Sequence, residues 1–400
     1  MIMKKGIKIL AITLVLCTAL AVSAFAANFE HCADALFELG LFRGTNNGYE
    51  LDREPTRAEA AAMLVRLLGA EEEAMALAYT APFGDVADWA KPYVQYLYDK
   101  GLTKGTSETT FGYSDKCTAQ QYATFLLRAL GYTDGEDFTY DTALEYGEKI
   151  MLCDWANCFG EVFLRDNVVA MSYTALSLPV KSGEGKLLSK LVSDGAVSDA
   201  KGYDELFENM RAYTAATETL NTAKKLSADI IIERGEEKEI AKYAMERNAE
   251  NPEKSIMAYV APEGQLSKYY SDGILYRELL GHIVKSEASY FDSVKIIGAA
   301  VSRDPISAVR TIEKKSEENA TTYKAVIRRE LLNAASAFGT TVCTSDMTVT
   351  VKLENESVVS VVTEMEGGIE ESIAMKLSYE NVKTGDEVEV IIPDEVLSAE

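Results

Sequence analysis

The chain has 400 residues, enough for two or three domains, and its 47% hydrophobic and 26% charged residues are typical of globular proteins. Its formal net charge is −23. A chain this acidic is repelled by nucleic acid and by anionic lipid surfaces, so we expect neither as a partner.

The first 26 residues are predicted to be a secretory signal peptide. Met1–Lys8 is short and basic, Ile9–Val22 is apolar apart from two threonines, and Ala24 and Ala26 place small residues where a signal peptidase cleaves. The alternative is a single membrane anchor, but the apolar run is shorter than the ~20 residues that a span needs. No later segment is long and apolar enough to cross a bilayer, so we expect no transmembrane segment in the mature chain.

Cysteine and histidine usage points to no cofactor or metal site. Five cysteines remain after the predicted cleavage, and these are Cys32, Cys117, Cys153, Cys158 and Cys343. An odd number leaves at least one unpaired in a monomer, and the closely spaced Cys153 and Cys158 could form a disulfide, although export does not require one. The two histidines are far apart in sequence, which disfavours a metal site.

The first half contains internal repeats. Leu36–Gly69 and Leu97–Gly131 align, with Gly40 matching Gly101, Thr56 matching Thr118 and Arg66 matching Arg128, and a more divergent third copy runs over Phe163–Leu176. We place the three copies at about 28–70, 83–132 and 138–178, inside a repeat domain of residues 27–200.

Each copy is predicted to be a helix, a loop and a second helix. Thr56 with Glu59, and Thr118 with Gln121, have the spacing of capping boxes at the start of the second helix. Gly101 is predicted to end the preceding helix in a left-handed conformation. One such hairpin cannot bury its own apolar face, whereas three copies can share a core.

Three motifs resemble those of the S-layer homology (SLH) family. Phe83–Ala90 resembles the F-x-D-V-x-x-x-W-A opening, Gly101–Gly105 the G-[IL]-x-x-G turn, and Pro55–Glu59 the I-T-R-A-E box. The resemblance covers roughly residues 28–180. It implies an all-α, pseudo-threefold domain that binds a secondary cell-wall polysaccharide, often one carrying pyruvate ketals, and therefore an exported bacterial protein held at the cell wall.

The resemblance also implies which residues bind the polysaccharide. The candidates are Thr56, Arg57, Glu59, Asp85, Trp89, Lys104 and Arg165. A guanidinium suits a ketal carboxylate and an indole suits a sugar ring.

The repeats depart from the family pattern. Ala119 replaces the arginine in the second copy and Asn167 replaces the glutamate in the third. The alternative is structural: Thr56 and Glu59 only cap a helix, Arg57 is a solvated charge, Trp89 is a core aromatic and Asp85 is a turn residue.

The second half, residues 201–400, is predicted to be an α+β domain with a curved antiparallel sheet. We expect helices over 186–193, 203–226, 289–300 and 328–338, and alternating strands beginning at Ile230 and over 347–353, 373–379 and 388–392. The order of elements resembles the half-barrels of LolA- and LppX-like proteins, especially Tyr269–Tyr276 and the closing Val388–Pro393 segment. This resemblance implies a concave apolar face for a lipid or peptide; the alternative is that helices fill it.

No catalytic constellation is present in the sequence, and the protein is not expected to be an enzyme. Glu364 and Glu366 share one face of a predicted strand, but in so acidic a chain this pair is interpreted as solvated surface. The leading interpretation is a wall-anchored surface protein that presents its C-terminal domain. The alternatives are a lipid- or peptide-binding module with the repeats as scaffold, and a wall-processing enzyme.

Overall fold

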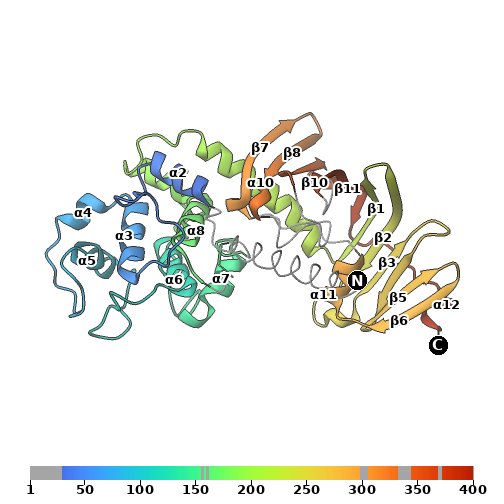
Figure 1. The fold of residues 1–400 in the computed structure, drawn as a ribbon, viewed down its shortest axis with the longest axis horizontal. Helices are drawn as coiled ribbons and strands as arrows, with labels where there is room; N and C mark the ends of the chain where they lie inside the picture. The colour runs from blue at the N-terminus through green and yellow to red at the C-terminus, as the bar shows by residue number, and fades with distance from the viewer. Residues whose placement is uncertain are drawn as a thin grey trace, which may run out of the picture. The chain divides into compact units, whose positions relative to one another are not determined.

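The computed structural model describes residues 29–154, 157–158, 162–297, 305–331, 344–367 and 372–399. The predicted signal peptide and Cys343 lie outside these residues. The chain divides into two units, residues 1–201 and 202–400 (Figure 1). No helix within the described ranges is long and apolar enough to cross a membrane.

The first unit is helical. Its elements are α2 (Glu30–Glu38), α3 (Arg57–Leu67), α4 (Glu71–Met75), α5 (Lys91–Asp99), α6 (Ala119–Ala129), the 3-10 turn η2 (Tyr140–Thr142), α7 (Ala143–Lys149), α8 (Arg165–Ser177) and α9 (Leu187–Ser193). α8 is buried along almost its whole length and contacts α2, α3, α6 and α9, which is typical of a helix at the centre of a core.

Both predicted capping boxes are confirmed. Thr56 caps α3, with reciprocal bonds to Glu59, and Thr118 caps α6, with reciprocal bonds to Gln121. In the third copy the Asn167 Oδ1 accepts the Leu164 N–H at 2.7 Å, so asparagine keeps half of the box. The expected left-handed glycine after α5 is also present, because Gly101 has φ +68°.

The second unit is an eleven-stranded antiparallel sheet with helices against it. The helices and turns are α10 (Tyr203–Thr222), η3 (Pro252–Lys254), α11 (Tyr290–Ile297), η4 (Ile306–Ala308), η5 (Arg329–Leu331) and α12 (Asp394–Leu397). The strands are β1 (Lys225–Arg234), β2 (Glu237–Glu246), β3 (Ile256–Val260), β4 (Ser267–Ser271), β5 (Ile274–Leu279), β6 (His282–Glu287), β7 (Val309–Ser316), β8 (Ala320–Ile327), β9 (Met347–Glu354), β10 (Ser357–Gly367) and β11 (Ile373–Thr384).

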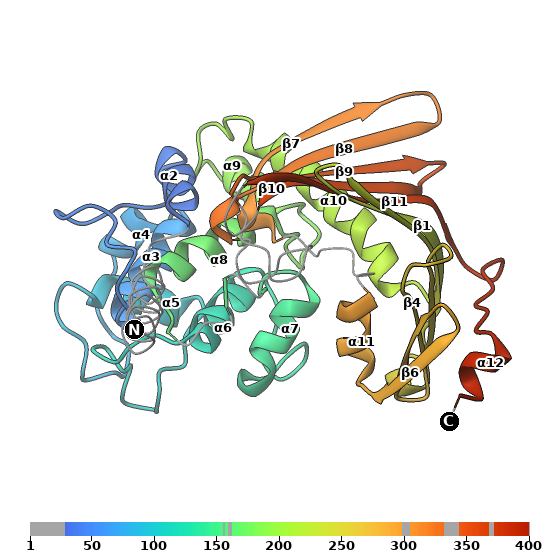
Figure 2. The same cartoon turned by 45° about the vertical axis from the view of Figure 1, so that its right-hand side comes forward.

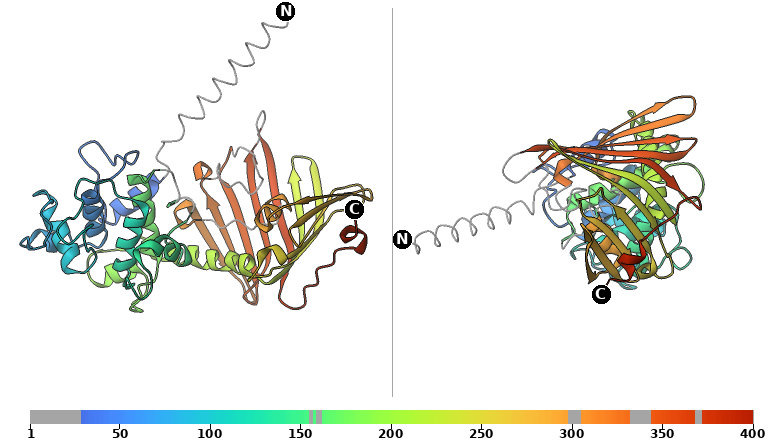
Figure 3. Two further views of the ribbon diagram at one scale, coloured as in Figure 1. Left: turned by 90° about the horizontal axis from the view of Figure 1, so that it is seen from below. Right: turned by 90° about the vertical axis from the view of Figure 1, so that its right-hand side faces the viewer.

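The strand order is β6-β5-β4-β3-β2-β1-β11-β10-β9-β8-β7, and the sheet is curved (Figures 2 and 3). β1 joins its two halves by pairing with β11, where Ile230 faces Tyr379. Alternate residues of the strands are buried, as in Met347, Val349 and Val351 of β9. α10 packs against β7 to β10 and α11 against β4.

Some predicted boundaries in this unit need correction. The strand expected over 388–392 is wrong, because these residues follow β11 in an extended segment without strand pairing. Val390 and Ile392 pack onto the side chains of β3 to β6, and packing of one side of an extended segment produces the same alternation as a strand. The helix expected over 203–226 ends at Thr222, and β1 begins at Lys225. Of the helix expected over 328–338, η5 is described and residues 332–338 lie outside the described ranges.

Candidate functional site

Arg57 is the first residue of α3, and a loop of the second repeat copy holds it in place. Its backbone N–H donates to the Asp115 carbonyl at 2.8 Å, and the Ala58 N–H donates to the Tyr113 carbonyl at 3.3 Å. The first N–H groups of a helix have no partner inside the helix, so the loop satisfies them. Residues distant in sequence are thereby joined at this helix end.

The side chain of Arg57 is buried without a counter-ion. Its Nε donates to the Phe111 carbonyl at 2.8 Å, and its guanidinium carbon lies 4.9 Å from the centroid of the Phe111 ring and 4.8 Å from that of Phe125. Arg57 is 5% exposed, and burial lowers its pKa. Within the described ranges no carboxylate forms an ion pair with it and its terminal nitrogens have no hydrogen-bond partner. A buried charge of this kind favours an anion.

A pocket of about 370 Å³ opens beside this guanidinium. It is lined by Arg57, Lys104, Gly105, Thr106, Gln121, Thr124, Phe125, Arg128, Asp134 and Tyr140. We call it the Arg57 pocket. The structure thus brings together two of the predicted residues, Arg57 of the first repeat copy and Lys104 of the second.

Cations outnumber anions in the Arg57 pocket. Asp134 accepts from Lys104 at 2.9 Å and from the Arg128 Nη2 at 2.8 Å, and these cations lower the pKa of its carboxyl group. Arg128 also donates to the Leu102 carbonyl, and its buried Nε has no hydrogen-bond partner among the described residues. One carboxylate therefore faces three cations, and the pocket is locally positive in a chain of net charge −23.

Asp85 and Trp89 do not line the pocket but contact the loop beside it. Asp85 accepts the backbone N–H groups of Phe111, Gly112 and Tyr113 at 2.7, 2.8 and 3.0 Å. Burial opposes ionisation of this carboxyl group, but the three N–H donors prevail and lower its pKa. Trp89 is 48% exposed and packs edge-on against Tyr93 and Tyr113. Both residues shape the loop that contacts Arg57.

Thr56 and Glu59 also lie outside the pocket lining. Besides capping α3, the Glu59 carboxylate accepts two bonds from Arg53, at 2.9 and 2.7 Å. Burial opposes the shift, but Arg53 and the Thr56 N–H lower the pKa of Glu59 to about 2. Glu59 is therefore ionised at neutral pH.

Arg165 forms a separate site with the first repeat copy. Its N–H donates to the Arg53 carbonyl at 2.9 Å, its Nε donates to the Tyr49 carbonyl at 3.0 Å, and its guanidinium lies over the Phe42 ring at 6.0 Å. Arg165 is 4% exposed, and burial lowers its pKa. We call these residues, together with Glu50 and Glu59, the Arg165 site.

The sequence analysis missed eight of the ten residues that line the pocket, and four of these carry polar side chains that matter for its chemistry. Gln121, Arg128, Asp134 and Tyr140 line the pocket, and the Tyr140 side chain is 44% exposed. Arg128 could have been predicted, because it aligns with Arg66 of the first repeat. Both arginines form an ion pair, Arg66 with Glu71 and Arg128 with Asp134. Nothing in the sequence around Asp134 and Tyr140 indicates in the same way that these residues line a pocket.

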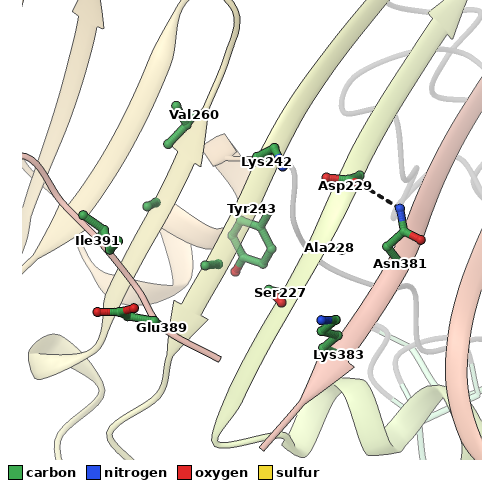
Figure 4. Close-up of a pocket in the computed structure, with 12 residues that line it drawn as sticks. Ser227, Ala228, Asp229, Lys242, Tyr243, Val260, Asn381, Lys383, Glu389 and Ile391 are labelled. Carbon is green, nitrogen blue, oxygen red and sulfur yellow. Dashed lines mark hydrogen bonds between the residues drawn. The ribbon is translucent and has the colours of Figure 1, made fainter. Parts of the chain in front are cut away.

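The second unit has pockets over its sheet and a small cavity beneath α10. A pocket of about 410 Å³ lies over β1, β2, β3 and β11, where the extended segment after β11 contributes Glu389 and Ile391, and Asn381 donates to Asp229 at 2.8 Å (Figure 4). A cavity of about 70 Å³ lies between α10, α11 and the sheet, well below the size of a typical small-molecule site. Glu364 is exposed, and its Oε1 lies 4.0 Å from the Nζ of Lys376.

Nothing in the described part of the chain groups three or more His, Cys, Asp or Glu side chains around a metal position. Cys32, Cys117, Cys153 and Cys158 are buried, and none of them forms a disulfide within the described residues.

Comparison with known proteins identifies part of the helical unit. Residues 82–121 match the S-layer homology domain. Two similar proteins are the middle cell wall protein of Brevibacillus brevis, 33% identical over 109 residues, and the surface layer protein of Brevibacillus choshinensis, 32% identical over 109 residues. Each match covers 26% of this chain and 10% of the relative, so the matched part spans about a tenth of either relative.

Among solved structures, the lipoprotein LppX of Mycobacterium tuberculosis is similar to part of the chain. The alignment covers 46% of this chain and 98% of LppX, with 8% identity and a TM-score of 0.31. The sequence matches are the stronger finding. Residues 82–121 therefore carry an S-layer homology domain, and with the surface-layer relatives they indicate a secreted protein of the bacterial cell surface.

Proposed function

We propose that this protein is held non-covalently at the cell wall by an anionic secondary cell-wall polysaccharide bound in the Arg57 pocket, and that it presents its second unit outward without catalytic activity. The observation that carries the proposal is the buried guanidinium of Arg57, which has no carboxylate partner in the described ranges and borders a pocket of about 370 Å³. A pyruvate ketal on a sugar supplies the missing carboxylate.

The pocket chemistry suits such a ligand. The Nε of Arg57 is occupied by the Phe111 carbonyl, so the terminal nitrogens remain for a carboxylate. The half-exposed ring of Tyr140 offers a flat apolar face to a sugar, and Thr124 and Gln121 add polar groups. In this proposal the aromatic platform is Tyr140, while Trp89 supports the neighbouring loop.

A closed bundle of three repeats is part of the proposal. The N–H groups of Arg57 and Ala58 donate to carbonyls of residues 115 and 113, and those of Arg165 and Asp166 donate to residues 53 and 51. In each case the loop before one copy's box receives the helix start of another copy. Two successive contacts of the same form support a rotational relation between the copies.

Co-sedimentation with purified wall tests this function. We expect Arg57→Ala to weaken binding of the full chain by at least about thirtyfold, because a buried charge pair is lost. Arg57→Lys keeps the charge without the planar fork and should give an intermediate loss. Arg277→Ala, on β5 of the second unit, controls for a change in net charge.

Two results would contradict the proposal. The first is an unchanged bound fraction for Arg57→Ala with an intact fold by circular dichroism. The second is equal binding to wall from which the secondary polysaccharide has been removed by acid.

A further inference from the structure

The pocket of about 410 Å³ in the second unit is bordered by a segment that crosses the sheet. We call residues 385–393, which follow β11 without strand pairing, the strap, and the pocket beside them the strap pocket. Val390 and Ile392 of the strap pack onto side chains of β3, β4 and β5. Glu389 and Ile391 alternate with them and line the pocket (Figure 4).

The strap pocket lies on the face of the sheet that turns away from α10 and α11. The small cavity beside these helices is lined by Met245 of β2, whose cross-strand partner is Met257 of β3. Ala244 and Ala258 are the adjacent pair, so they point to the opposite face, where both line the strap pocket. The two openings are therefore on different sides of the sheet.

A β-bulge turns polar side chains of β11 into the strap pocket. The register of β1 and β11 shifts between Ser227 and Asp229, where β11 contains one extra residue and Asn381 has φ +52°. Simple alternation would put Asn381 and Lys383 on the face of Tyr379, which lines the cavity beside the helices, but both line the strap pocket. The Asn381 Nδ2 donates to the Asp229 carboxylate at 2.8 Å.

Four charged side chains line the strap pocket, and their charges balance. They are Lys242, Lys383, Asp229 and Glu389. None of them forms an ion pair with another described residue, although Asp229 and Lys242 are direct cross-strand neighbours. Separated charges of both signs complement a ligand that also carries both signs.

The strap presents main-chain groups that lack partners among the described residues. The Val388 N–H donates to the Gly385 carbonyl at 3.1 Å, but from Glu389 to Ile392 no backbone N–H or carbonyl forms a hydrogen bond within these ranges. An extended segment directs its N–H and carbonyl groups to its two sides, as the edge strand of a sheet does. A second extended chain beside the strap satisfies these groups.

The strap pocket has room for such a chain. Ser227, Ala244 and Ala258 give it small side chains, and its volume of about 410 Å³ is within the range of ligand sites. At its rim the apolar side chains of Val260 and Ile391 are 42% and 65% exposed. An apolar residue of a bound chain removes this surface from water.

We propose that the strap pocket binds an extended peptide segment of another protein. The segment adds a strand beside the strap, covers Val260 and Ile391 with an apolar side chain, and places a carboxylate between Lys242 and Lys383. Main-chain pairing supplies affinity, and the side-chain contacts supply specificity. The proposal goes beyond wall attachment, because it gives the presented unit a partner of its own.

Fluorescence anisotropy of the full chain with a labelled peptide tests the binding. The probe is Lys-Val-Thr-Val-Glu with carboxyfluorescein at its N-terminus and an amide at its C-terminus, so that alternate residues are apolar. We expect a dissociation constant of about 100 µM or tighter. The same peptide with all its peptide-bond amides N-methylated has no donors for the strap and should bind at least about tenfold more weakly.

A double-mutant cycle tests the carboxylate contact. The chain variant carries Lys242→Gln and Lys383→Gln, and the peptide variant carries Gln in place of Glu. Each change alone should weaken binding by at least about fivefold, and the two together should cost little more than one of them. Lys314→Gln with Lys324→Gln, on β7 and β8, makes the same change in net charge and should leave binding within about twofold. An unchanged thermal midpoint checks the fold of each variant.

Hydrogen exchange shows where the peptide lies, since a bound strand should slow exchange of the amides from Glu389 to Ile392. No binding at about 1 mM peptide, equal binding of the N-methylated peptide, or protection that omits the strap would overturn the proposal. Additive effects in the cycle would overturn the carboxylate contact. Wall co-sedimentation of the lysine variant should match that of the natural chain, so failure here leaves the proposed wall attachment standing.

Discussion

Ionised side chains in the helical unit are held by specific donors. Glu59 accepts two bonds from Arg53 and the N–H of Thr56, so its pKa of about 2 lies below the usual 4.5. Asp85 is held by three backbone N–H groups in the same manner. A lowered carboxyl pKa means that the folded state binds the proton less readily than the unfolded chain.

The pKa of Glu59 predicts an acid-sensitive component of stability. Its contribution is fully present above about pH 4.5 and is lost as the pH falls toward 2. The shift corresponds to about 3 kcal/mol for a shielded group, and since the side chain is 25% exposed we expect about 1–2 kcal/mol. Urea unfolding at pH 6 and pH 3 should show this loss in the natural chain, and Glu59→Gln should reduce it. An equal loss in both chains would contradict the assignment.

At the scale of the element, two glycines of one turn have different reasons to be glycine. Gly101 ends α5 at φ +68° with nothing within 4 Å of an added Cβ. Gly105, at φ +76°, would place a Cβ 2.4 Å from the Phe83 ring and 2.6 Å from the Thr110 carbonyl. The first is required by conformation alone and the second also by close packing.

These surroundings predict unequal costs for the same substitution. Gly101→Ala should lower the free energy of unfolding by about 1 kcal/mol, the cost of a left-handed alanine. Gly105→Ala should cost about 2–3 kcal/mol, because a rigid ring and a carbonyl must also move. Chemical denaturation of the two variants measures the difference. Equal costs would show that the Gly105 turn relaxes freely.

At the scale of the whole molecule, the two units are expected to unfold separately. The two tryptophans of the sequence, Trp89 and Trp155, both belong to residues 1–201, whereas the strands belong to residues 202–400. Tryptophan fluorescence therefore reports on the first unit, and the β signal in circular dichroism reports on the second.

We expect Gly105→Ala to shift the fluorescence transition to lower denaturant and to leave the β transition in place. Separate cores give separate cooperative transitions. A common shift of both signals would show that the units unfold as one, and the natural chain measured in the same buffer provides the reference for both signals.

Local chemistry accounts for what the sequence predicted well. The capping boxes at Thr56 and Thr118 depend on residues three apart, and the alternation in β9 and β11 depends on residues two apart, so both can be recognised in the printed chain. The alternation over Val388–Pro393 misled for the same reason, because it records a buried side but not a hydrogen-bonded neighbour.

The sequence alone determined the capping boxes, the alternating strands β9 and β11, the S-layer homology motifs and the identity of Arg57 as a candidate. Only the tertiary structure decided that Arg57 meets Lys104, Gln121, Arg128 and Tyr140 in one pocket, and that Asp85 and Trp89 lie beside it instead. The reason is physical: periodicity and capping are set by neighbours along the chain, whereas the pocket and its charge depend on which helix starts and loops of different repeats pack together.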